Sequence, residues 1–300
     1  MSEATGSGRP VKGAKRPIDR DGTNEIVGDD QNGPPNETAT FRAPVQWVDW
    51  KPEETSLRTT FISDLHLFSN RSSAVRWHDR MEASVAGSDL CIWGGDLFDF
   101  RWATVPDRSV DAAFDFLNRF ADRHPRVRFL YLSGNHDAHH EFRDRMPCFI
   151  EGLPNFVGYG DAFRFGQTLW LHGDVIEGGR KHDGFLRYRR SWGDKPPAKP
   201  WMSGVYDAAV ATRLHRAVAA AGHPQRFTCR KLHRWVRRQP KLNDIRRVVF
   251  GHTHRLIRGT RYRDLRFYNG GAAIRHVAFE PIELTVSRPS PGTAPSAGSL

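Results

Sequence analysis

Five short polar motifs, placed where β-like apolar runs end, limit the folds open to this chain more than any other feature of its sequence. The motifs are Asp64-Leu65-His66, Gly95-Asp96-Leu97-Phe98-Asp99, Gly134-Asn135-His136-Asp137, His172-Gly173-Asp174 and Gly251-His252-Thr253-His254. Four of them directly follow an apolar run, and the predicted strands cover residues 58–63, 89–94, 127–133, 168–172 and 246–250. Because α/β folds gather functional loops at strand ends, the pattern predicts one polar site at the edge of such a structure.

Helical patterns lie between the predicted strands, at residues 73–86 and 109–124. The second has apolar residues at helical spacing, Ser109 as its expected N-cap and Pro125 just beyond its end. Strands and helices that alternate in this way predict βαβ units packed into an α/β sandwich. Later runs at residues 265–269 and 277–286 are expected to add strands to a second sheet.

The length and composition of the chain fit one large α/β domain or two small ones, because 300 residues with 38% hydrophobic content can fill a sizeable core. Residues 1–40 and 287–300 are rich in small and polar residues, so we expect a disordered leader and tail around a folded body at 41–286. We find no apolar run that fits a signal peptide or a membrane-spanning helix, and therefore expect a cytoplasmic protein.

The formal charge of +11 is concentrated in one segment of the chain. Residues 175–250 contain 18 Lys and Arg against 5 Asp and Glu, a net charge of +13, so the rest of the chain carries −2. Such a segment favours an anionic partner, which could be a nucleotide, a nucleic acid, a phosphorylated lipid or a membrane surface. The alternative is a solvated face with no partner.

The donor types in the five motifs indicate a metal site without sulfur ligands. Cys91, Cys148 and Cys229 are odd in number and far apart, so we expect reduced, buried thiols and not a disulfide framework or a cysteine zinc site. Each polar motif alone is a weak signal, but all five in order offer carboxylate, imidazole and amide ligands. These donors suit Mn, Fe, Zn, Co or Mg.

Taken together, the motifs resemble the signature of the calcineurin-like metallophosphoesterases: D-x-H, G-D-x-x-D, G-N-H-D, a later His and G-H-x-H, here spanning residues 64–254. The resemblance implies a four-layer αββα sandwich with a helical cap insertion. It also implies two divalent metal ions, with Mn²⁺ favoured. One ion would be held by Asp64, His66, Asp96 and His254, and the other by Asp96, Asn135, His172 and His252. Asp96 would bridge the two ions.

Such a pair of ions determines the expected chemistry. Two ions about 3.5 to 4 Å apart lower the pKa of a bridging water, hold it as hydroxide for in-line attack on phosphorus and neutralise the phosphoryl oxygens. His136 lies next to Asn135 in the sequence and is expected to protonate the leaving oxygen. Asp99 is expected to orient His136 through a hydrogen bond. Alternatively, Asp99 and Asp137 cap their own loops.

Three of the motifs are similar, in more detail, to the UDP-2,3-diacylglucosamine pyrophosphohydrolase branch of the superfamily. The similar stretches are 95–102, 172–174 and 251–255, although the branch commonly carries Arg where this chain has His136. That branch has a helical insertion between its His-Gly-Asp and Gly-His-x-His motifs, which clasps a nucleotide-linked lipid. Here the corresponding insertion, at about 175–245, holds the basic excess, and helices are predicted at 205–221 and 225–238.

The resemblance predicts an anionic phosphorylated substrate, with a UDP-diacylglucosamine-like nucleotide lipid as the first candidate. The candidate substrate contacts are Arg101, Arg187, Arg189, Arg230 and Arg234. The second predicted helix mixes aromatic residues with Lys and Arg, so it could also lie on the anionic inner face of a membrane. Its aromatic residues could instead be ordinary core contacts beside solvated arginines.

Three other functions are compatible with parts of the sequence. A nuclease or cyclic-nucleotide phosphodiesterase would use the same ligands with a nucleic-acid-like substrate. A scaffold that kept the fold without catalysis should have lost ligands, whereas a residue able to bind metal stands at each ligand position here. A basic nucleic-acid-binding module would leave the ligand set unexplained. The sequence predicts no oligomeric state.

Overall fold

Ten strands form two five-stranded sheets in the part of the chain that the computed structural model describes, residues 45–177, 184–212 and 224–288. The first sheet has the order β10-β1-β2-β3-β4, and its strands are β1 (Ser56–Ile62), β2 (Leu90–Trp93), β3 (Arg128–Leu132), β4 (Phe156–Gly160) and β10 (Ile282–Ser287). The second has the order β5-β6-β7-β9-β8, and its strands are β5 (Ala162–Phe165), β6 (Thr168–Leu171), β7 (Arg247–Phe250), β8 (Leu256–Tyr262) and β9 (Leu265–Gly270). β1 to β4 are parallel, as are β6, β7 and β9, and β10, β5 and β8 pair antiparallel at the sheet edges.

Side chains of the central strands alternate between two cores, and this alternation shows how the sheets are layered. In β2, Leu90 and Ile92 lie in a core shared by strands of both sheets, whereas Cys91 and Trp93 pack towards the helices. In β6, Trp170 joins the shared core and its two neighbours join a third core on the opposite face. Because side chains alternate between the faces of a strand, each sheet is buried on both faces and the two sheets stack on one another.

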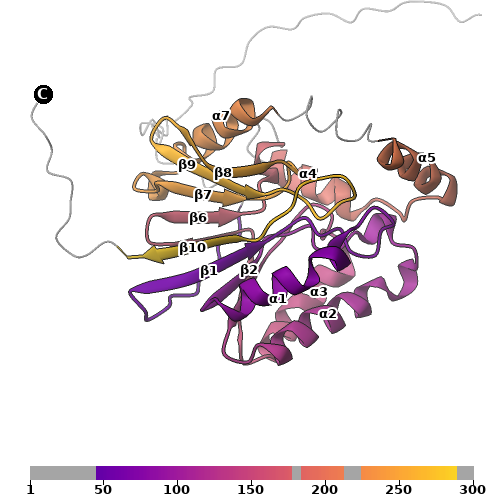
Figure 1. Ribbon diagram of the computed structural model, residues 1–300, viewed down its shortest axis with the longest axis horizontal. Coiled ribbons are helices and arrows are strands. Elements are labelled where there is room, and N and C mark those ends of the chain that lie inside the picture. The colour runs from indigo at the N-terminus through magenta and orange to yellow at the C-terminus, as the bar shows by residue number, and fades with distance from the viewer. Residues whose placement is uncertain (1–44, 178–183, 213–223, 289–300) are drawn as a thin grey trace, which may run out of the picture. The chain divides into compact units, whose positions relative to one another are not determined.

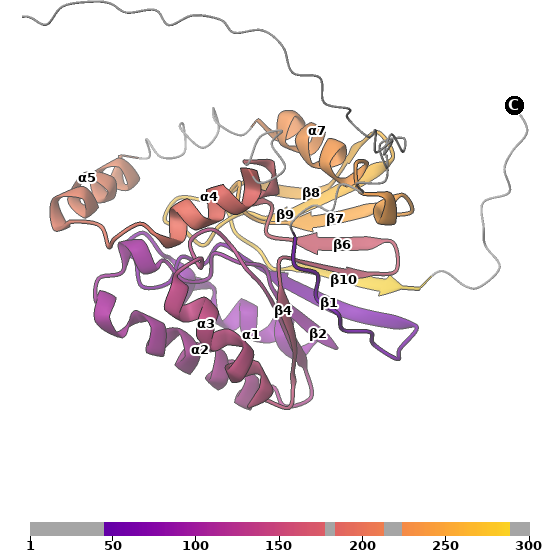
Figure 2. The same cartoon turned by 180° about the vertical axis from the view of Figure 1, so that it is seen from behind.

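Helices cover the two outer faces of the stacked sheets. α1 (His78–Ala86), α2 (Ser109–Arg123) and α3 (His140–Glu151) pack on the first sheet, and α7 (Gln225–Val236) packs on the second, as Figures 1 and 2 show. α7 is held by its apolar side, because Cys229, Leu232 and Val236 are buried in the outer core of the second sheet. The result is the predicted αββα sandwich, a mixed α/β fold with two sheets flanked by helices.

The insertion between the two late motifs contributes three described helices to this architecture. They are α4 (Gly184–Gly193), α5 (Pro200–Ala211) and α7. The predicted helix at 225–238 is confirmed by α7, and the one at 205–221 corresponds in part to α5, with residues 213–223 outside the described part of the chain. The predicted leader at 1–40 and all but the first two residues of the predicted tail also lie outside it.

Most sequence predictions for the strands are confirmed, and three local predictions are wrong. Ser109 is the first residue of α2, and the N-cap is Arg108; the Ser109 hydroxyl donates to the Pro106 carbonyl at 2.7 Å. The last predicted strand is shorter than expected and joins the first sheet, where β10 pairs with β1. Cys148 is exposed, whereas Cys91 and Cys229 are buried as expected.

Several elements were not predicted from the sequence. α3 contains Pro147, which cannot donate a helical hydrogen bond and usually ends a helix. β4, β5, β8 and α4 were also missed, and β4 has only two buried residues, Phe156 and Gly160. Among the described residues, we find no helix that combines the length and apolar character needed to cross a bilayer.

Candidate metal centre

All seven candidate ligands come from loops at the ends of strands, and the two sheets share them. Asp64, Asp96 and Asn135 follow β1, β2 and β3 of the first sheet, and the histidine ligands His172, His252 and His254 follow β6 and β7 of the second. Parallel strands place their carboxyl ends at one edge, so stacking the two sheets brings both sets of loops together.

Two groups of ligand atoms that share Asp96 result from this arrangement. Asp64, His66, Asp96 and His254 each offer a ligand atom within 4.8 Å of the others, and so do Asp96, His172 and His252. These are the two sets that the resemblance implies, apart from Asn135. The Asn135 amide oxygen is buried and has no hydrogen-bond partner among the described residues. A buried acceptor left unpaired costs about 1 to 3 kcal/mol, which coordination to a cation would offset. The residues present therefore fit a pair of ions.

The backbone at the ligands adopts a conformation that side chains usually avoid. Left-handed φ angles occur at Asp64 (55°), His66 (47°), Asp96 (52°), His252 (67°) and His254 (53°). Each such residue costs on the order of 1 to 3 kcal/mol and persists only where the surroundings impose it. Five of them within one ligand set indicate that the fold places these side chains at the expense of local stability.

Two glycines of the motifs are required by close approach to a carboxylate. A Cβ on Gly134 would overlap the Asp96 carboxylate and backbone nitrogen, and one on Gly251 would overlap the Asp64 carboxylate. A glycine at each of these positions therefore leaves room for the ligand side chain. Asn269, which the sequence analysis did not single out, supports the same region by donating to the Gly251 carbonyl at 2.7 Å.

Hydrogen bonds fix the orientation of the ligand side chains. His172 Nδ1 lies 2.9 Å from the Gly94 carbonyl, which can only accept, so this nitrogen carries the proton and Nε2 faces Asp96 at 3.2 Å. Asp64 accepts the His252 backbone N–H at 2.9 Å, and Asp96 accepts the His136 backbone N–H at 2.7 Å. The first bond joins a loop of the second sheet to one of the first, and the second bond joins two neighbouring loops of the first sheet.

The charges in the cluster predict how metal affinity depends on pH. Burial disfavours a charged His172, but the Asp96 carboxylate raises the pKa of His172 to about 10. Burial and Arg71 lower the pKa of His66 to about 3, so His66 is already neutral at physiological pH. A ligand histidine must be neutral, so metal binding displaces the His172 proton at any pH below about 10.

We therefore expect Mn²⁺ affinity to rise about tenfold per pH unit between pH 7 and 9, with about one proton released per chain. Calorimetry in buffers of different ionisation enthalpy measures the released proton directly. An affinity that does not change over this range would contradict a protonated His172 in the metal-free protein.

His136 and Asp99 form a hydrogen-bonded pair beside the ligands. His136 Nδ1 lies 2.8 Å from Asp99 Oδ1, and Arg71 Nη2 donates to Asp99 Oδ2 at 2.5 Å. Although burial favours the neutral acid, Arg71 and His136 hold the pKa of Asp99 well below its usual value. An ionised Asp99 keeps the proton on His136 Nδ1 and leaves Nε2 facing away from the pair. Arg71 was not predicted, because a single arginine in a polar loop carries no distinctive signal.

The sequence left open whether Asp99 and Asp137 only cap their own loops. In the structure Asp99 contacts His136, whereas Asp137 holds a loop. Asp137 accepts backbone N–H groups from Asp96 at 2.5 Å and Phe98 at 3.1 Å. Asp137 therefore joins the loop after β3 to the loop after β2 and fixes the backbone that carries Asp96.

The five arginines predicted to contact substrate lie in different places. Arg101 lines a cavity of about 260 Å³ that also contains His136, Trp192 and Lys195. Arg187 is exposed on α4. Arg230 and Arg234 lie on α7 and line a separate cavity, whose lining includes none of the seven candidate ligands. The basic helix α7 thus covers the second sheet and not the ligand cluster.

Arg189 is engaged in a buried network, a placement that differs from the predicted substrate contact. Its guanidinium pairs with Asp174 and with Asp161 at 2.9 Å, and donates to the Ser133 carbonyl at 2.5 Å. These bonds involve all three guanidinium nitrogens, so the side chain connects α4 to the loops after β3 and β6.

Arg189→Met is expected to lower the free energy of unfolding by about 3 to 5 kcal/mol, because it leaves buried carboxylates without a partner. Chemical denaturation measures the loss. Arg190→Met is the matched control on the same helix, since Arg190 is exposed and its substitution should change stability by about 0.5 kcal/mol or less. Equal stability of the two variants would exclude this structural role.

A family model agrees with the geometry of the site. The family model described as calcineurin-like phosphoesterase matches residues 57–256. A dimetal phosphatase from Danio rerio is a similar solved structure, with 11% sequence identity and a TM-score of 0.42, covering 77% of this chain and 99% of that one. A search of curated proteins finds no match. Because the family model spans two thirds of the chain and includes every candidate ligand, the chain belongs to the calcineurin-like phosphoesterases and is a metal-dependent hydrolase.

Proposed function

We propose that this hydrolase cleaves a phosphoester or pyrophosphate bond at a dinuclear metal centre, and that the group leaving phosphorus is itself negatively charged. The observation that supports the first part is the pair of ligand groups that share Asp96. The second part is supported by the cavity beside His136, described below.

The donor atoms support the following assignment of the ions. Asp64, His66, Asp96 and His254 would hold one ion, and Asp96, Asn135, His172 and His252 the other. When bound, the ions would supply Lewis acidity, which neutralises phosphoryl oxygens and lowers the pKa of the attacking water. The oxygen and imidazole donors suit Mn²⁺, our first choice, and also Fe, Zn, Co or Mg.

His136 is the residue that we propose moves a proton. Its Nδ1 is occupied by Asp99, so Nε2 is the nitrogen that can donate to a leaving oxygen. The side chain is 9% exposed and forms part of the cavity wall, so a substrate in the cavity can reach it. Its ring centroid lies 4.4 Å from that of Trp192 on α4, which limits how far the ring can move.

The cavity beside His136 offers charge and an aromatic surface to the leaving group. Lys195 Nζ lies 3.6 Å from the Trp192 ring centroid, and burial together with the neighbouring Arg101 lowers the pKa of Lys195. Two cations in a partly buried cavity favour an anionic group, and an indole favours a planar or apolar one. Of the two acids in the lining, Asp107 and Glu141, the second pairs with Arg145 at 3.1 Å.

A pyrophosphate bond in a nucleotide-linked substrate has these properties, because cleavage releases a phosphorylated leaving group. We propose a UDP-diacylglucosamine-like nucleotide lipid as the leading example. The nuclease alternative shares the ligand set and differs only in the substrate that the cavity admits.

Metal-stripped protein reloaded with Mn²⁺ tests this assignment. The panel is p-nitrophenyl phosphate, bis-p-nitrophenyl phosphate, UDP-sugars, a UDP-diacylglucosamine and single-stranded DNA. We expect the highest kcat/KM on a pyrophosphate substrate, and a rise in KM for that substrate in Arg101→Met and Lys195→Met. Turnover concentrated on single-stranded DNA would instead establish the nuclease, and no metal-dependent turnover on any member would contradict hydrolysis itself.

A further inference from the structure

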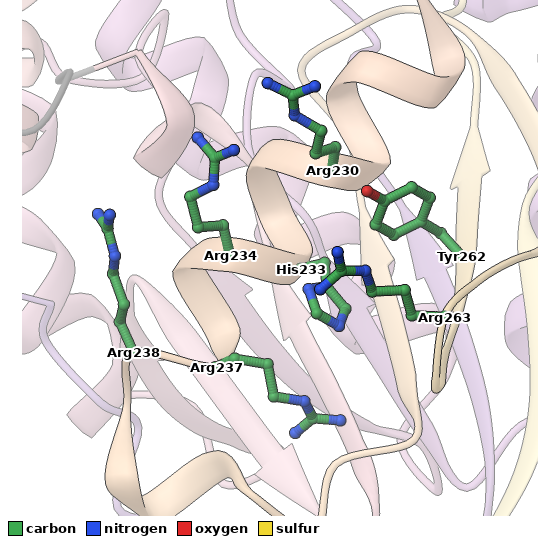
Figure 3. Close-up of a pocket in the computed structure, with 7 residues that line it drawn as sticks. All are labelled: Arg230, His233, Arg234, Arg237, Arg238, Tyr262 and Arg263. Atoms are coloured by element: carbon green, nitrogen blue, oxygen red, sulfur yellow. The ribbon is translucent and has the colours of Figure 1, made fainter.

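A row of arginines runs along the exposed side of α7, on the outer face of the second sheet. Arg226, Arg230 and Arg234 are spaced four residues apart, and Arg238 follows at the same spacing just beyond the helix. Four residues of helix advance about 6 Å, so the three helical members cover about 12 Å in a nearly straight line. Figure 3 shows Arg230, Arg234 and Arg238 extending to the same side of the helix.

These arginines differ from their neighbour Arg237, which has structural partners. Arg237 donates to the backbone carbonyls of Leu242 and Ile245 at 2.8 and 2.9 Å and pairs with Asp264. Among the residues that the structure describes, no ion pair or side-chain hydrogen bond involves the guanidinium of Arg230, Arg234 or Arg238. Like charges four residues apart on a helix repel one another, so the row has no folding role that we can identify.

The row borders a groove between α7 and the hairpin of β8 and β9. Two adjoining cavities, of about 450 and 740 Å³, share Tyr262 and Arg263 in their linings and so form one elongated depression. Arginines form most of the lining of the first cavity, and all of them follow position 229 in the sequence. The lining of the second cavity includes Arg226, nearer the start of α7. Neither lining contains an Asp or Glu among the described residues, which makes the whole groove strongly positive.

Aromatic rings accompany the cations. Tyr262 lies at the junction of the two cavities, with its hydroxyl towards Arg230 in Figure 3. Phe227 is 44% exposed on α7, and its ring centroid lies 5.0 Å from Lys231 Nζ and 5.8 Å from the Arg230 guanidinium carbon. Phe227 is exposed and Tyr262 is partly buried, and accessible rings beside a line of cations are the combination on which nucleobases stack while their phosphates meet the charges.

We propose that this groove binds single-stranded nucleic acid, with the backbone phosphates along Arg226, Arg230, Arg234 and Arg238. Guanidinium groups bind phosphate through two parallel hydrogen bonds, and their regular spacing suits a linear chain of phosphates. An anionic bilayer is less well matched, because the charges border an elongated hollow and Phe227 is the only large apolar side chain of α7 that is exposed. The site holds none of the metal ligands, so strand binding does not depend on hydrolysis.

Fluorescence anisotropy of the full chain in EDTA tests the proposal without cleavage. The probes are a labelled single-stranded oligonucleotide and its duplex, and flotation with phosphatidylglycerol vesicles is measured in parallel. We expect single strands to bind more tightly than duplex or vesicles. The affinity should fall with salt, with a slope reduced by about 0.7 for each phosphate contact removed.

The test variant is Arg230→Gln/Arg234→Gln/Arg238→Gln. Its matched control is Arg76→Gln/Arg119→Gln/Arg126→Gln, which makes the same charge change on exposed arginines in the short 3₁₀ helix Ala74–Trp77 and on or just after α2. The groove variant should bind at least about tenfold more weakly, with a salt slope smaller by about 2, while the control stays near wild type. Phe227→Ala should also weaken binding. Thermal melts check that both triple variants are folded. Equal affinities of the two triple variants, a preference for duplex, or binding to vesicles alone would each overturn the proposal.

Discussion

Asp96→Asn is expected to abolish binding of the two-ion set and to reduce metal-dependent turnover by about 10³-fold or more. A bound pair of ions would supply several kcal/mol of charge stabilisation in the transition state, and each 1.4 kcal/mol corresponds to about tenfold in rate. Asp96 belongs to both ligand groups, so its charge is needed by both. Asparagine keeps the size of the side chain but removes the negative charge.

The same substitution separates metal binding from folding. Wild-type protein should melt at a higher temperature with Mn²⁺ than without, because the ions bind only the folded chain. In Asp96→Asn this metal-dependent rise should disappear, and elemental analysis should find fewer than two ions. Asp115→Asn, an exposed acid on α2, is the control and should retain both properties. Two ions and normal turnover in Asp96→Asn would show that Asp96 is not a shared ligand.

His136→Gln is expected to lower kcat by about 10² to 10⁴-fold while both ions remain bound. The imidazole is not needed for coordination in our assignment, and its contribution is a proton delivered from Nε2 to the leaving oxygen. The loss should be largest for poor leaving groups, such as alkyl phosphates, and smallest for p-nitrophenol, which leaves without protonation. This dependence on the leaving group distinguishes proton donation from a general disturbance of the site.

Two further variants complete this experiment. Asp99→Asn should give a smaller loss, about 10 to 100-fold, because it acts by positioning His136. His78→Gln removes a half-exposed histidine at the start of α1 and should leave turnover unchanged. Full turnover of His136→Gln on alkyl phosphates would exclude the proton-donor role.

The candidate site could be predicted from the sequence because its ligands are local features. Each ligand motif lies at or just after a buried, apolar strand, and such strands are visible as runs of branched and aromatic residues. The edge at which they meet follows from the parallel order of β1 to β3 and of β6 and β7. Neither inference requires knowledge of how distant helices pack.

The supporting residues could not be predicted, because their roles depend on contacts between distant parts of the chain. Arg189 looks like any other arginine in a basic segment, yet it is buried against Asp161 and Asp174. Asn269 supports the Gly251 loop from a strand eighteen residues away. The positive charge of the insertion was visible in the sequence. The direction in which each arginine faces was not, because it depends on how α7 packs on the second sheet.

Titration of metal-stripped protein with Mn²⁺, followed by calorimetry and by turnover of bis-p-nitrophenyl phosphate, tests the dinuclear centre most directly. The arrangement around Asp96 predicts two ions bound per chain, with turnover appearing as the second equivalent binds. Saturation at a single ion, or undiminished turnover in the metal-stripped protein, would contradict it.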